Sequence, residues 1–182
     1  MLPLTRNYLL PTLWIAFAWL AVPVRADEAA DVKSLIARGD LPAALARAEA
    51  ASAAKPRDAQ LRFLQGVVLM DLQRDEAALT VFTQLTQEYP ELPDPYNNIA
   101  LLQVRAGQLE LAQQSLESAL RGDPNHRTAR ANLGQVHLML AAKAWEMAAA
   151  KGPIDPSLQR RLDAVRGLLS SPAMSTPAAA PR

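Results

Sequence analysis

The chain lacks cysteine and is poor in several other residues that commonly carry chemistry. Its 182 residues include two histidines, seven glycines and only 5% aromatic residues, and the formal net charge is +1. Without cysteine the chain forms no disulfide and cannot carry the lipid-modified cysteine of a bacterial lipoprotein. The charges are balanced and form no basic stripe with interleaved aromatics, so nucleic acid is not an expected partner.

Residues that could form a catalytic or metal site are equally scarce. There is no glycine-rich phosphate loop, and the serines and threonines lack a nucleophile signature. His126 and His137 stand eleven positions apart, too far for a pair of metal ligands on one helical turn. We therefore expect no enzyme, no catalytic residue, no cofactor and no metal.

Prolines supply the most regular feature of the sequence. Pro56, Pro90 and Pro124 are separated by 34 residues twice over, a period typical of helix-turn-helix repeat arrays. Small or apolar residues recur at fixed distances before each proline, which indicates helices that pack at the same points in every repeat. They are Ala44, Ala78 and Ala112 twelve residues before, Ala48, Phe82 and Leu116 eight before, and Ala51, Leu85 and Ala119 five before.

This pattern resembles the tetratricopeptide repeat family, and the N-terminus suggests a secreted bacterial member. The first helix of each repeat carries the expected contact position as Val32, Gly66, Ala100 and Gly134, and the expected turn glycine is present as Gly39 and Gly107 but replaced by Gln73. The aromatic residue usual near the repeat start is present only as Tyr96. The resemblance implies an all-α, right-handed α-solenoid of about three helix pairs.

The period also predicts where the repeats and helices begin and end. Repeats are expected at 27–56, 57–90 and 91–124, with helices at about 28–38 and 41–54, 58–72 and 75–89, and 93–106 and 109–122. Helix starts carry Asp58, Asp75 and Asp94, whose carboxylates can accept from free backbone amides. Helix ends carry Gly39, Gly107 and Gly122.

The fourth copy, 125–153, departs from the period. Pro153 follows Pro124 by only 29 residues, and no glycine, proline or asparagine lies between Gly134 and Gly152 where a turn should fall. We predict one continuous helix at about 127–150, with a tightly turned hairpin as the alternative. Asp155 and Pro156 then start a C-terminal capping helix within 154–169, and residues 170–182 have the composition of a disordered tail.

The first 26 residues have the features of a secretory signal peptide. Arg6 precedes an apolar run at 13–22, and Val24 and Ala26 supply small residues for a cleavage site. Cleavage after Ala26 would release a periplasmic protein of net charge −1 that has no contact with the membrane. The alternative is an uncleaved inner-membrane anchor that leaves the repeats facing the periplasm.

Family resemblance implies a concave surface that receives a protein or peptide partner. Asn98 and Asn132 occupy equivalent first-helix positions and resemble the start of an asparagine ladder that holds an extended chain. The basic residues of a carboxylate clamp are missing at Ala29 and Asn98, so capture of a C-terminal carboxylate is not predicted. The full set of predicted partner-binding residues is Asn97, Asn98, Asn132, Phe63, Leu64, Val67, Leu101, Arg105 and Gln135.

The expected function is that of a non-catalytic adaptor in the cell envelope. Two alternatives stay open at the level of sequence. One is a self-assembling structural protein that forms a homodimer through the long helix and the C-terminal helix. The other is a scaffold anchored to the membrane by its N-terminus.

Overall fold

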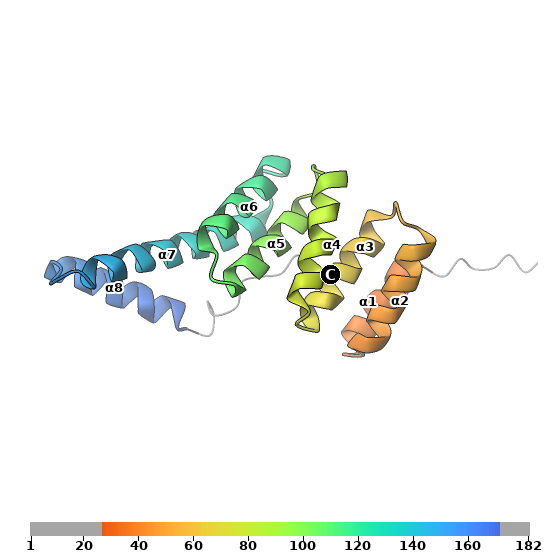
Figure 1. The fold of residues 1–182 in the computed structure, drawn as a ribbon, viewed down its shortest axis with the longest axis horizontal. Coiled ribbons are helices and arrows are strands. Elements are labelled where there is room, and N and C mark those ends of the chain that lie inside the picture. The colour runs from red at the N-terminus through yellow and green to blue at the C-terminus, as the bar shows by residue number, and fades with distance from the viewer. Residues whose placement is uncertain (1–26, 172–182) are drawn as a thin grey trace, which may run out of the picture.

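The chain forms a row of paired α-helices. A computed structural model describes residues 27–171, within which there are eight helices and no strand. The helices are α1 (Glu28–Ala37), α2 (Leu41–Ala54), α3 (Ala59–Asp71), α4 (Asp75–Glu88), α5 (Pro93–Arg105), α6 (Leu109–Gly122), α7 (Arg127–Ala149) and α8 (Pro156–Leu169). They follow one another along the long axis of the molecule, from α1 and α2 at one end to α7 and α8 at the other (Figure 1). The all-α solenoid expected from the sequence is confirmed.

The turn inside each of the three helix pairs has the same geometry. Gly39 and Gly107 have φ angles of +76° and +72°, in the left-handed region that glycine adopts without strain. The next residue donates its N–H to the carbonyl five positions back, as Asp40 does to Leu35 and Gln108 does to Gln103. Gln73 makes the same turn in the second repeat with φ +58°, although its side chain disfavours that conformation.

The acidic residues at helix starts divide into two groups. Asp58 accepts from the N–H groups of Gln60 and Leu61 and is a true N-cap of α3. Asp75 and Asp94 were expected to do the same, but they lie inside the first turns of α4 and α5, which have no side-chain cap. Their carboxylates instead bind side chains from the next repeat, Arg105 and His126. Both still lie at the positive end of a helix dipole.

Residues that recur with the proline period form the core. Ala44, Ala78 and Ala112 are fully buried, as are Phe82 and Leu116. The small residues let the two helices of a pair approach closely, while the large ones fill the space beside them. Gly66 shows how close the approach is, because a Cβ built there would lie 2.5 Å from Cε1 of Phe82.

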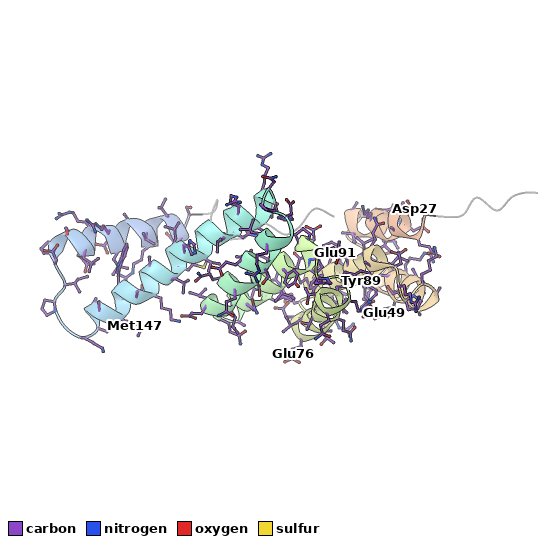
Figure 2. The ribbon with its side chains drawn as sticks, turned by 90° about the horizontal axis from the view of Figure 1, so that it is seen from above. Asp27, Glu49, Glu76, Tyr89, Glu91 and Met147 are labelled. Carbon is purple, nitrogen blue, oxygen red and sulfur yellow. The ribbon has the colours of Figure 1, made fainter. Side chains whose placement is uncertain are left out.

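The fourth repeat is a single helix, as its missing turn residues predicted. α7 is 23 residues long and spans about 35 Å at 1.5 Å per residue. Its first half packs on α5 and α6. Its second half packs on α8 through a small cluster of Ala142, Leu162 and Val165, and it still reaches α6 through the ion pair of Lys143 with Glu110. Figure 2 shows the distal part of α7, with Met147 near its end, extending away from the repeats beside α8.

Candidate functional site

A groove opens on the face formed by the first helices of the repeats. α1 packs closely on α3, and α5 on α7, whereas the backbones of α3 and α5 stay further apart over the described residues. Pro93 and Pro95 begin α5 at this point, and Pro93 suits the first turn because it needs no hydrogen-bond acceptor for its nitrogen. The space between the two helix starts has a volume of about 370 Å³.

Apolar side chains make up most of the groove lining. Phe63 and Leu64 of α3, which the sequence predicted as binding residues, both contribute. The ring of Phe63 is half-buried and packs against Phe82 with the ring centroids 5.7 Å apart and a tilt of 51°. Phe82 therefore holds the ring in place while part of it stays open to a partner. The remaining lining residues are Lys33, Ala59, Gln60, Leu92, Asp94 and Pro95.

The second half of the predicted site is closed. Leu101, Asn132 and Gln135 lie in the contact between α5 and α7, together with Val104 and Met139, and no water-sized space is left among them. All three are buried. The groove therefore ends before the fourth repeat, whose single helix, α7, packs directly on α5.

The asparagines lie inside the array and not on its surface. Asn97 and Asn98 have no exposed area, and Asn132 is almost fully buried. The Nδ2 of Asn132 donates to the Oδ1 of Asn97 over 2.8 Å, which ties α7 to α5. This differs from the exposed ladder expected from the sequence. A hydrogen bond between buried amides fixes how two repeats meet, because either amide would lose solvation if its partner were removed.

The other predicted residues also have roles within the fold. Val67 is buried in the core of the first two repeats. Arg105 is exposed, and its Nη1 lies 2.9 Å from the Oδ1 of Asp75, so its guanidinium bridges α5 and α4. Of the nine predicted residues, Phe63 and Leu64 line the open groove, where Phe63 is partly exposed and Leu64 is buried with 1% of its area exposed.

Both histidines were expected to be structural, and the structure gives them different surroundings. His126 is the N-cap of α7: its Nδ1 accepts from the N–H of Ala129 over 3.0 Å, and its Nε2 lies 2.8 Å from the Oδ1 of Asp94. His137, in α7, is exposed. The reason is that α7 continues straight on, so no second helix of a fourth pair covers this face.

Sequence reasoning missed Gln60, Leu92 and Pro95 as groove residues. The cluster of prolines at 90, 93 and 95 was a signal, since it marks an unusual entry into α5. Within residues 27–171 no group of three or more acidic or histidine side chains could hold a metal ion. No helix in that same range is long and apolar enough to cross a membrane.

Comparison with known proteins identifies the family. Residues 30–93 and 97–157 match the model of the tetratricopeptide repeat, and together they make up more than half of the chain. No curated protein matches the sequence.

Several solved structures share the fold. The first TPR of Spaghetti (RPAP3) bound to the HSP90 peptide SRMEEVD has a TM-score of 0.58 at 17% identity, covering 63% of this chain and 90% of that one. MamA from Desulfovibrio magneticus RS-1 has a TM-score of 0.56 at 18% identity, with 79% and 76% covered. Pseudomonas aeruginosa pilF has a TM-score of 0.57 at 16% identity, with 81% and 78% covered. The family-model match and the shared fold together show that the chain belongs to the tetratricopeptide repeat family.

Proposed function

We propose that this protein is an exported adaptor that binds a segment of a partner protein in the groove between α3 and α5. Its tetratricopeptide repeat fold supports a role in protein–protein interaction in general. The observation that carries the finer proposal is the groove itself, about 370 Å³ and lined by Phe63, Leu64 and Leu92. An open apolar depression on rigid helices is a preformed binding surface, so the conformational entropy lost on binding is mainly that of the partner.

Site-specific crosslinking tests the groove. A photoreactive amino acid is placed at Gln60, an exposed residue of the groove, and in a second variant at Gln84, an exposed glutamine on α4 outside it. We expect illumination of the producing cells to yield a protein adduct from position 60 and none from position 84. Adducts from position 84 alone would refute the assignment of the binding face.

Export to the periplasm rests on the leader at 1–26, which lies outside the described residues. The test is mass spectrometry of the protein from fractionated cells of its own host. We expect a periplasmic protein that begins at Asp27. A chain that keeps its leader and fractionates with the inner membrane would favour the anchored scaffold.

Homodimer formation is a second candidate function, favoured by the hairpin of α7 and α8. Among the described helices α8 packs mainly on α7, and Met147 and Leu168 are 60% and 52% exposed. Figure 2 shows Met147 far from the repeats, where a second copy could reach it. Light scattering at tens of micromolar distinguishes the two states. A dimer that Met147→Glu and Leu168→Glu convert to a monomer would support self-assembly, and a monomeric wild type would refute it.

A further inference from the structure

The groove between α3 and α5 carries an uncompensated positive charge at one edge. Lys33 on α1 is exposed and lines the groove, and it forms no ion pair with any of the described residues. Most other groove residues are apolar. A single ammonium beside an apolar surface attracts a carboxylate, and none of the described acidic side chains is close enough to Lys33 to form an ion pair with it.

Asp94, the acidic residue of the groove, forms a hydrogen bond with His126 at the start of α7. Asp94 lies across the groove on α5, and its Oδ1 is 2.8 Å from the Nε2 of His126. The tautomer of His126 follows from its second contact. Its Nδ1 accepts the N–H of Ala129, so the ring proton must sit on Nε2 and is donated to Asp94. The Asp94 carboxylate is therefore held toward α7, and the amide ends of α5 stabilise its charge.

The apolar lining lies between these two charges. Phe63 projects from α3, and Leu92 and Pro95 come from the start of α5, so a bulky side chain can enter between the two helices. A carboxylate next to that side chain would be attracted to Lys33 on the α1 edge and repelled from Asp94 on the α5 edge. The arrangement therefore selects both the residue types and their direction in the groove.

We propose that the groove recognises an internal peptide segment in which a bulky aliphatic or aromatic residue lies within two positions of an aspartate or glutamate, with the carboxylate on Lys33. This inference rests on the proposed function, because it specifies the chemistry of the partner at the same groove. Phe63 and Leu92 supply the contact area, and Lys33 supplies the preference for acid.

Peptide selection tests this preference without knowledge of the partner. The probe is a random dodecapeptide library displayed with both peptide ends joined to the display protein, so that no terminal carboxylate is present. The target is protein purified from cells that express the whole 182-residue chain. Enriched peptides are then synthesised with capped ends, in acidic and matching amide forms, and titrated by fluorescence anisotropy.

We expect enriched peptides to pair an apolar residue with an acidic one. Changing that acid to its amide should weaken binding about two- to fivefold, the factor for one solvent-exposed ion pair. Lys33→Met should abolish the difference between the two peptide forms. Lys151→Met is the matched control and should leave the difference unchanged, because Lys151 is also exposed and forms no ion pair within residues 27–171 but lies beyond the end of α7. Asp94→Asn keeps an acceptor for His126 and should strengthen acidic peptides about twofold.

The outcomes separate this inference from the proposed function. If peptides lose binding in Phe63→Ser, the groove is the binding site. The inferred role of Lys33 is then overturned if these peptides show no acid preference, or if Lys33→Met leaves their acid preference intact. Peptides unaffected by Phe63→Ser, or a selection with no groove-dependent binder, overturn both. If Phe63→Ser fails to fold, Gln60→Trp is the substitute, because it fills the groove from an exposed position.

Discussion

The glycines at the repeat contact position provide a matched test of how tightly the helices pack. Gly66 in α3 and Gly134 in α7 occupy the same place in the second and fourth repeats. A Cβ on Gly66 would lie 2.5 Å from Cε1 and 2.7 Å from Cζ of Phe82, whose side chain is fully buried. Apart from its chain neighbours and the backbone of its own helix, a Cβ on Gly134 would meet no heavy atom within 4 Å. The same substitution by alanine should therefore have opposite effects.

The magnitudes follow from two terms. Alanine is favoured over glycine in a helix interior by about 1 kcal/mol, and this is the only term for Gly134→Ala. Gly66→Ala also forces an extra methyl group into a packed site, at a cost of about 1–3 kcal/mol. The cost lies toward the upper end, because carbon atoms pack best at about 3.5–4 Å. We expect Gly134→Ala to stabilise by about 0.5–1 kcal/mol and Gly66→Ala to destabilise by about 1–2 kcal/mol.

Urea unfolding followed by circular dichroism measures both effects. The free energies are comparable if the slope with urea is unchanged between variants. A double-mutant cycle with Phe82→Leu isolates the clash, since the smaller side chain should cost less stability in the Gly66→Ala background than in the wild type. The packing argument fails if Gly66→Ala stabilises the protein as Gly134→Ala does, or if the two substitutions act additively.

Three further predictions concern stability. Gln73→Gly should stabilise the protein by about 0.5–1 kcal/mol in urea unfolding. It removes the strain of a non-glycine residue in the left-handed conformation, about 1–2 kcal/mol, and adds the backbone entropy that glycine loses on folding, about 0.5–1 kcal/mol. The control is the reverse change, Gly107→Gln, which should destabilise the protein. Asn132→Ala should destabilise the protein by about 1–3 kcal/mol, because it leaves the buried Oδ1 of Asn97 without its donor. Adding Asn97→Ala to that variant should cost little further stability, and full additivity of the two losses would contradict this. The pKa of Glu88 lies below its ordinary value of 4.5, because Arg62 donates hydrogen bonds of 2.5 and 2.9 Å to the carboxylate. The pair therefore stabilises the fold fully above pH 4.5, and this stabilisation is lost as the pH falls through the lowered pKa of Glu88. Arg62→Met should be less stable than wild type at neutral pH but lose less stability on acidification below about pH 4.5, and parallel acid profiles would refute the assignment.

Local sequence determined the helices and their ends. Pro56, Pro90 and Pro124 mark the interval, and Gly39 and Gly107 mark turns, because each residue restricts its own backbone whatever surrounds it. The single helix α7 was predictable for the same reason, since the segment contains no residue that would end it. The helix pairs and the repeat family could therefore be predicted from residue type and spacing.

Tertiary structure decided which repeat positions reach solvent. The period assigns Asn98 and Asn132 to a groove position, but exposure depends on how far apart neighbouring first helices lie. α5 and α7 lie close enough to bury the asparagines, while α3 and α5 leave space for a partner beside Phe63. The same distinction separates Gly66, covered by Phe82, from Gly134, which has no second helix over it. Repeat position is a property of the chain alone, whereas burial is set by the neighbouring elements, so the sequence predicted the array and the structure located its open surface.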